Sequence, residues 1–86
     1  MNKKMTKSEL KNGMIVELEN NRRYMVLNEN LINMDVYIFP LEWYSEDLIC
    51  RYEKKSIVKV YYLKTASSLK NVFLHDGRLE LIWERK

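Results

Sequence analysis

The sequence predicts a mainly β domain in which five short strands form a small, partly open barrel or a strongly bent antiparallel sheet. Apolar and polar residues alternate in several short runs, which is the period of a half-buried strand. Turn-forming pairs such as Asn12-Gly13 and Asp76-Gly77 separate these runs. Eighty-six residues are enough for one hydrophobic core, so residues 1–86 are expected to form a single domain.

The first nine residues are expected to be a flexible or short helical basic segment. Thr6-Lys7-Ser8-Glu9 has the spacing of a capping box, in which the Glu side chain reaches back to the start of a helix. Only Leu10 and Lys11 precede Asn12-Gly13, which interrupts any helix. One helical turn is therefore the most that this segment can form.

A β-hairpin is predicted from Gly13 to Asn28, with its polar tip at Glu19-Asn20-Asn21-Arg22. Met14, Val16 and Leu18 form one apolar row, so the first strand is expected to bury one face. In the second strand apolar residues occupy both faces, and we expect both to be buried.

The middle of the chain is less regular. The segment 31–39 is expected to form a third strand, or two short ones if the polar Asn33-Met34-Asp35 interrupts it. Pro40 ends this strand because it has no N–H to donate to a ladder. Residues 41–48 are aromatic and acidic, and are expected to form a loop or a single helical turn.

The final third contains the clearest strand pattern, at 56–63, where Val58, Val60 and Tyr62 alternate with residues of the opposite face. The segment 66–74 places two large apolar residues four apart, which predicts a short helix. A turn with Asp76-Gly77 follows. Residues 79–85 are expected to be the last strand, and its inward-facing residues are expected to be Leu79, Leu81 and Trp83.

The net charge of +3, from 15 basic and 12 acidic residues, is a mild basic excess. Much of it lies near the ends of the chain and is expected to be solvated: Lys3, Lys4, Lys7, Lys11, Arg85 and Lys86. The only cysteine, Cys50, can form no internal disulfide, which favours a reducing, cytoplasmic setting. Neither a secretory signal nor an apolar stretch of about 20 residues is present, so we expect no membrane association.

No catalytic, cofactor-binding or metal-binding constellation is apparent, and we expect the protein not to be an enzyme. The single histidine, His75, lies in a polar turn, and Cys50 has no base beside it in the sequence. The acidic residues between 42 and 53 lack the glycine-assisted spacing of a cation-binding loop.

A protein-binding surface is the leading hypothesis, because aromatic residues concentrate in one segment. Five of the ten aromatic residues lie between positions 37 and 52, and aromatic side chains beside charged ones commonly anchor protein interfaces. A homodimer interface is included in this hypothesis. The candidate partner-binding residues are Tyr37, Phe39, Trp43, Tyr44, Glu46, Asp47, Arg51 and Tyr52. The alternative is that these rings belong to the core.

A nucleic-acid-binding surface is the runner-up hypothesis. Aromatic side chains stack on bases and basic side chains contact phosphates. The candidate contacts are Arg22, Arg23, Arg51, Lys54 and Lys55. The acidic residues of the same segment would repel phosphates, which favours a protein partner.

Four segments in order, LKNGMIVELENNRRYMVLN, WYSEDL, SIVKVYYL and LELIWER, resemble a group of small phage and prophage proteins with an SH3-like barrel. The matching positions are Gly13 with Val16, Arg23-Tyr24 with Val26, Tyr44 to Leu48, Ile57 to Tyr61, and Leu79 to Arg85. The resemblance implies a five-stranded SH3-like barrel and carries no catalytic residues. It is compatible with an inhibitor of host machinery or defence, including an anti-CRISPR-like protein. A structural or oligomer-forming accessory protein is a third hypothesis.

Overall fold

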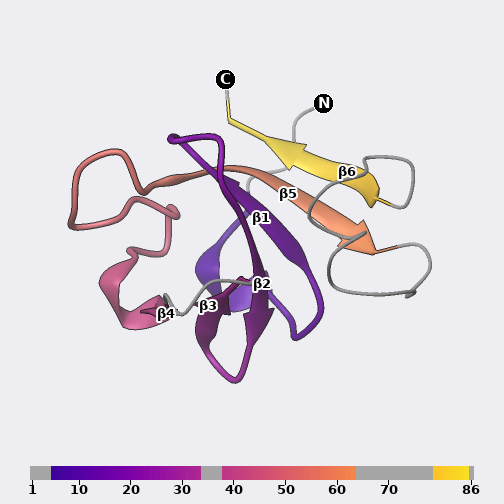
Figure 1. The fold of residues 1–86 in the computed structure, drawn as a ribbon, viewed down its shortest axis with the longest axis horizontal. Coiled ribbons are helices and arrows are strands. Elements are labelled where there is room, and N and C mark those ends of the chain that lie inside the picture. Colours follow the sequence, from indigo (N-terminus) through magenta and orange to yellow (C-terminus); the bar gives the residue numbers. More distant parts are fainter. Residues whose placement is uncertain (1–4, 34–37, 64–78, 86) are drawn as a thin grey trace.

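The protein folds into one six-stranded antiparallel sheet in the computed structural model, which describes residues 5–33, 38–63 and 79–85. The strand order is β4-β3-β2-β1-β5-β6 (Figure 1). The elements are η1 Lys7–Glu9, β1 Ile15–Leu18, β2 Arg23–Leu27, β3 Asn30–Ile32, β4 Ile38–Pro40, η2 Leu41–Trp43, β5 Ile57–Leu63 and β6 Leu79–Glu84. The predicted mainly β class is confirmed. The predicted helix at 66–74 lies outside the described residues.

The predicted hairpin is formed by β1 and β2, which pair with Ile15 opposite Met25 and Glu17 opposite Arg23. Gly13 precedes it with a φ of +94°, a conformation that suits glycine, and donates its N–H to the carbonyl of Val26 (2.8 Å). The two strands of the hairpin are therefore also joined by a hydrogen bond at the end away from the tip.

The burial of the two hairpin strands differs from the prediction, which was one buried face for β1 and two for β2. Ile15 is fully buried, so β1 buries residues on both faces, whereas the exposed fraction of Leu27 in β2 is 40%. The reason is a second, smaller cluster on the other face of the sheet, in which Ile15 packs with Tyr61 and Leu79. Leu27 instead lies at the end of its strand, next to the turn that leads to β3.

The segment 31–39 forms two strands, as one of the predicted alternatives required. Leu31 of β3 pairs with Phe39 of β4 in an antiparallel register. A two-residue turn, Asn28-Glu29, joins β2 to β3, and both of its residues have positive φ (50° and 63°). Because of this split, the described residues form six strands rather than the five predicted.

Two bulges change which residues of the last two strands face the core. Glu17 pairs with Lys59 and Leu18 with Ile57, so Val58 is an extra residue in β5. Ile57 and Val60 consequently reach the same core. In β6, Ile82 is extra, because Val60 pairs with Trp83 and Tyr61 with Leu81.

The bulge in β6 corrects part of the prediction for that strand. Leu79 is buried as expected, but Leu81 is 47% exposed. Ile82 and Trp83 pack against the main core from partly buried positions. Leu79 packs with Ile15 and Tyr61 in a second, smaller cluster, so Leu79 and Leu81 share the face opposite the main core, and the extra residue turns Trp83 towards the main core.

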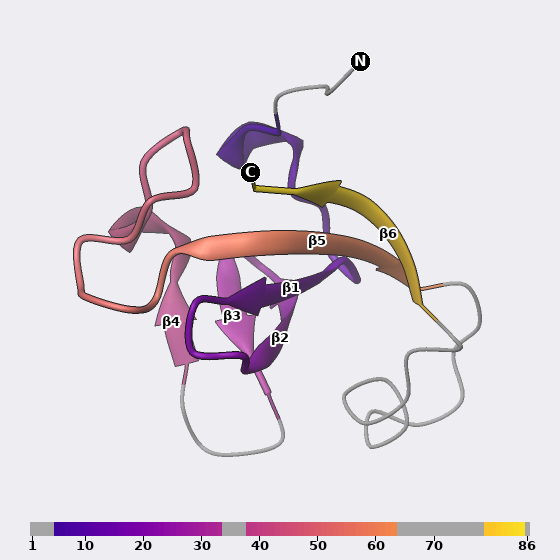
Figure 2. The ribbon, with the colours of Figure 1, turned by 90° about the horizontal axis from the view of Figure 1, so that it is seen from above.

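The sheet curls around its main core, and the segment before β5 closes the open side (Figure 2). Strands β1, β2, β3 and β5 supply one part of this core. The closing segment supplies another part, namely Leu41, Tyr44, Leu48 and Cys50. Met5 and Leu10, on either side of η1, also pack against it. The irregular part of the chain is thus a structural component of the fold.

Candidate functional site

Four aromatic side chains form a continuous row from the core to the surface. The ring centroids of Tyr24 and Phe39 lie 5.0 Å apart, those of Phe39 and Trp43 lie 5.7 Å apart, and those of Trp43 and Tyr52 lie 4.7 Å apart. Each spacing is within the range of favourable aromatic pairs. We call Tyr24, Phe39, Trp43 and Tyr52 the aromatic row.

The fold brings these rings together from separate elements. Tyr24 belongs to β2 and Phe39 to β4, the two strands that flank β3, and Trp43 ends η2. The chain then turns back, and the N–H of Arg51 donates to the carbonyl of Trp43 (3.0 Å). This bond holds the neighbouring Tyr52 beside Trp43. Tyr24 is buried, Phe39 and Trp43 are partly buried, and Tyr52 is 47% exposed.

Tyr44 was predicted to be a surface anchor, and the structure places it in the core instead. Its side chain is 2% exposed. Its hydroxyl donates to the backbone carbonyl of Lys55 (2.7 Å), and burial raises the pKa of this hydroxyl well above its usual range. Tyr44 therefore supports the loop that carries Lys55, and cannot itself contact a partner.

Further hydrogen bonds fix the same loop. The buried Ser56 accepts the N–H of Cys50 at its Oγ (2.9 Å), and its own N–H donates to Glu19 Oε1 (3.1 Å). The N–H groups of Asp47 and Ile49 both point to the Oγ of Ser45 (3.2 and 3.3 Å). The loop is thus tied to itself and to the β1–β2 hairpin.

A shallow hollow of about 380 Å³ lies next to the buried end of the aromatic row. Its lining residues come from the hairpin tip, β2, β4 and the loop before β5: Asn20, Arg22, Tyr24, Phe39 and Lys55. The Nζ of Lys55 lies 5.7 Å from the centroid of the Phe39 ring, at cation–π distance. No carboxylate is among these five lining residues. We call this site the basic hollow.

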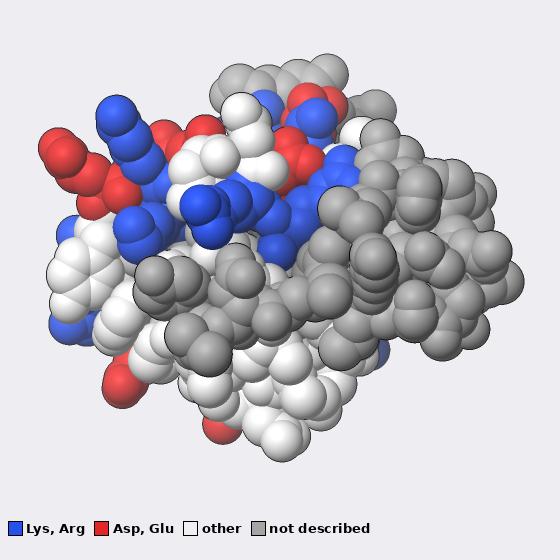
Figure 3. Space-filling model, viewed as in Figure 1, with Lys and Arg blue, Asp and Glu red and all other residues white. Residues whose placement is uncertain are grey.

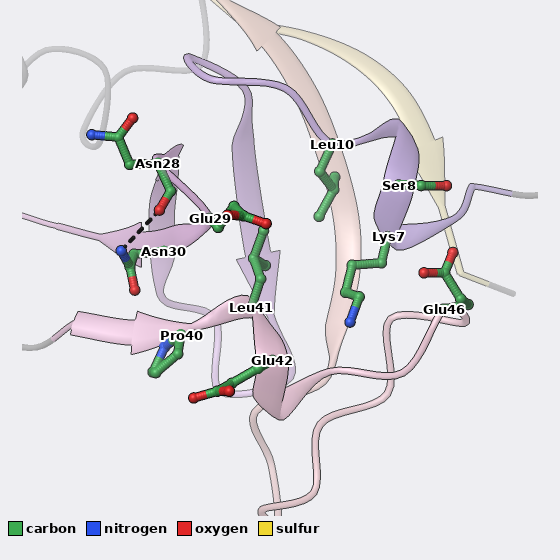
Figure 4. Close-up of a pocket in the computed structure, with 10 residues that line it drawn as sticks. All are labelled: Lys7, Ser8, Leu10, Asn28, Glu29, Asn30, Pro40, Leu41, Glu42 and Glu46. Atoms are coloured by element: carbon green, nitrogen blue, oxygen red, sulfur yellow. Dashed lines mark hydrogen bonds between the residues drawn. The ribbon is translucent and has the colours of Figure 1, made fainter.

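A second hollow, of about 600 Å³, has the opposite charge (Figure 4). Three glutamates line it: Glu29 of the β2–β3 turn, Glu42 of η2, and Glu46. Lys7 of η1 also lines it and donates its Nζ to the carbonyl of Tyr44 (2.9 Å). Lys7 was expected to be solvated, and this bond corrects the expectation. The two hollows share no lining residue.

The predicted site residues therefore divide into groups. Phe39, Trp43 and Tyr52 lie together, and Arg22 and Lys55 lie together beside Phe39. The other predicted residues do not belong to these two groups. Glu46 lines the second hollow, and Asp47, Arg51 and Lys54 are exposed in the loop before β5. Tyr37 lies outside the described residues.

Arg23 does not join the other basic candidates. Its Nε lies 3.0 Å from Glu17 Oε1, and its guanidinium carbon lies 5.1 Å from the centroid of the Tyr61 ring. Adjacent residues of a strand face opposite sides of a sheet, so Arg23 faces away from the buried Tyr24. Its guanidinium group therefore interacts with Glu17 and Tyr61 of the same fold.

Sequence reasoning missed Tyr24 as a lining residue of the basic hollow and gave Asn20, at the hairpin tip, only as a secondary candidate for contact. Tyr24 was expected to be core, and it is, but its ring also carries the aromatic row inward. Its proximity to Phe39 depends on β2 and β4 flanking one short strand. No local pattern in the sequence predicts that β2 and β4 lie on either side of β3.

Across residues 5–33, 38–63 and 79–85, no three His, Cys, Asp or Glu side chains gather as a metal site would require. No helix in this part of the chain is long and apolar enough to span a bilayer.

Comparisons of the chain with protein-family models, with curated proteins and with solved structures find no match. The resemblance to small phage proteins therefore rests on the four sequence segments alone.

Proposed function

We propose that this chain is a non-enzymatic binding module that holds a protein partner on the exposed end of the aromatic row. The observation that carries the proposal is the continuous contact from the core tyrosine Tyr24 to the half-exposed Tyr52. An exposed ring that is already packed against another ring loses little rotamer freedom when a partner covers it. Such rings are typical centres of binding energy in protein interfaces.

The surroundings of the row support a protein partner. Figure 3 shows Lys and Arg side chains over the hairpin tip and the loop before β5, with Asp and Glu side chains at their outer edge. An aromatic centre with a mixed polar rim is the usual composition of a protein interface. Phe39, Trp43 and Tyr52 are the proposed anchors, and Arg51 belongs to the rim.

A more specific proposal concerns the kind of protein partner and the cellular compartment. The sequence resemblance supports a phage- or prophage-type protein with an SH3-like barrel that inhibits host machinery or defence in the bacterial cytoplasm, in the manner of an anti-CRISPR protein. The buried single cysteine, Cys50, suits a reducing compartment. A homodimeric accessory protein is the competing proposal, and the mass of the protein in solution separates the two.

Tyr52→Ala tests the protein-binding proposal. We expect this variant to lose at least about tenfold in the amount of partner captured from a bacterial lysate by the immobilised protein, as expected for an interface anchor. Quantitative mass spectrometry of the captured proteins is the measurement. The matched control is Tyr62→Ala, which removes a tyrosine of similar exposure (49% against 47%) outside the aromatic row.

The thermal midpoint of both variants should stay within about 3 °C of the parent protein, because substitutions of exposed residues usually change stability little. Equal capture by Tyr52→Ala and the parent, or an equal loss for Tyr62→Ala, would remove the aromatic row from the proposed interface.

The second candidate function is nucleic-acid binding, which the basic hollow favours. Arg22 and Lys55 line it beside the aromatic ring of Phe39, without a lining carboxylate. A mobility shift of a single-stranded oligonucleotide that weakens steeply with salt is the expected result for this function. Absence of a shift at low salt would exclude it.

A further inference from the structure

The basic hollow has the chemistry of a carboxylate site. Asn20, Arg22 and Lys55 all carry side-chain N–H donors, and the other two lining residues, Tyr24 and Phe39, are aromatic. A carboxylate accepts hydrogen bonds only, and its bonds to Arg and Lys are stronger than those between neutral groups. The aromatic wall suits the methylene groups that carry a carboxylate in a glutamate side chain.

The backbone that carries the donors of this hollow is held in place before any ligand arrives. At the hairpin tip the backbone N–H of Arg22 donates to Asn20 Oδ1 (3.0 Å), and Asn21 between them adopts a positive φ of 69°, which asparagine tolerates. On the opposite side, the hydroxyl of Tyr44 holds the backbone of Lys55. Binding therefore requires little ordering of the backbone, which is favourable for affinity.

The distribution of charge restricts the size of the ligand. Glu19 is the first residue of the hairpin tip and Glu53 lies two residues before Lys55, and both are exposed. A nucleic acid presents a row of phosphates and needs an extended basic track. A single carboxylate needs only the local donors of the hollow.

We infer that the basic hollow binds an acidic side chain from an extended peptide segment of the protein partner, with a neighbouring apolar side chain of that segment against Phe39 and Trp43. This inference rests on the protein-binding function proposed above and names the chemistry of the partner. The partner segment carries Glu or Asp next to a large apolar residue.

The test uses two capped peptides and the intact protein. The acidic probe is acetyl-Gly-Ser-Glu-Phe-Glu-Ser-Gly-amide, and the neutral probe replaces both Glu residues with Gln. Each is titrated at low salt into isotopically labelled protein, and chemical-shift changes give the affinity and the place of binding. We expect the acidic probe to bind at least about fivefold more tightly, with shifts at Phe39, Lys55 and the indole of Trp43.

Variants of the protein assign the preference to the hollow. Lys55→Gln is expected to remove most of the difference between the two probes, and Lys55→Arg to keep it. Lys11→Gln is the matched control, because it removes an equal charge from an exposed residue outside both hollows. A well-dispersed spectrum of each variant verifies that it folds.

Three outcomes would overturn the inference. These are equal binding of the two probes, no shift at millimolar peptide, and a short oligothymidine that binds at least about tenfold more tightly at the same residues. The last result would assign the hollow to nucleic acid. Capture of a partner that depends on Tyr52 would still stand if the acidic probe failed, so failure of this inference is distinguishable from failure of the binding function.

Discussion

At the scale of single residues, Tyr44 and Tyr52 show why an aromatic-rich segment is ambiguous in sequence. Both tyrosines lie in the same loop, yet Tyr44 is 2% exposed and Tyr52 is 47% exposed. Nothing in the local pattern separates them, because the loop has no regular period. The difference arises from the hydrogen bond of Tyr44 to Lys55 and from the edge-to-face contact of Tyr52 with Trp43. Both depend on how the chain folds back.

Tyr44→Phe isolates the contribution of the buried hydroxyl. Removal of its 2.7 Å hydrogen bond to the carbonyl of Lys55 should lower the free energy of unfolding by about 1–2 kcal/mol at neutral pH, while the ring remains packed. For a domain of this length, this corresponds to a decrease of about 4–15 °C in the thermal midpoint. Denaturant titration and thermal melting are the measurements. An unchanged midpoint would mean that the bond contributes nothing.

The same variant gives a pH dependence with a definite sign. Burial raises the pKa of Tyr44 above the value of about 10 that it has in the unfolded chain. The protonated form is favoured in the folded state, so this contribution to stability is complete below about pH 10 and is lost as the pH rises above it. We expect the stability gap between the parent and Tyr44→Phe to narrow by up to about 1.4 kcal/mol per pH unit above pH 10. A constant gap from pH 8 to 11 would contradict this.

At the scale of elements, the sequence predicted the positions of the strands better than it predicted which residues of each strand face the core. The hairpin and the split of the segment 31–39 were both anticipated, because polar tips and alternation are local signals. The bulges at Val58 and Ile82 were not, since an extra residue leaves the composition of a strand unchanged. The second bulge places Leu81 and Trp83 on opposite faces, whereas strict alternation had placed them on the same face.

The turn between β2 and β3 offers a prediction of increased stability. Both Asn28 and Glu29 have positive φ, as a two-residue type I′ hairpin turn requires, and this turn prefers Asn followed by Gly. Glu29→Gly should remove the steric cost of the Cβ atom and raise the free energy of unfolding by about 0.5–1 kcal/mol. Glu29→Ala is the matched control, because it loses the same carboxylate but keeps the Cβ atom. Equal stability of the two variants, measured by denaturant titration, would contradict the explanation.

At the scale of the whole molecule, the candidate site and the core share one segment. Leu41, Leu48 and Cys50 close the main core, while Phe39, Trp43 and Tyr52 form the aromatic row within the same stretch of chain. The sequence placed the candidate site in this segment, and it did not predict how the residues of the segment divide between core and surface. That division depends on the curl of the sheet, which brings the hairpin tip next to Lys55.

Arg85 provides the last prediction, because one side chain connects the final strand to two distant parts of the fold. Sequence reasoning expected a solvated terminal charge. The structure shows its Nη2 donating to the carbonyls of Ile57 and Asp47 (2.9 Å each), its Nε donating to Ile57 (3.2 Å), and its guanidinium carbon 5.2 Å from the Trp83 ring centroid. These bonds join the end of β6, the start of β5 and the loop that closes the core.

Arg85→Ala should therefore lower the free energy of unfolding by about 1–3 kcal/mol, since hydrogen bonds from a charged donor are lost and a partly buried side chain is removed. Arg85→Lys should recover only part of this, because an ammonium cannot reproduce the planar fork of the guanidinium. The matched control, Arg51→Ala, removes an exposed arginine and should change stability by less than about 0.5 kcal/mol. Hydrogen exchange locates the effect: amides of the β5–β6 ladder should lose protection in Arg85→Ala before those of the β1–β2 hairpin. Uniform loss across both ladders would mean that Arg85 does not act as a local clamp.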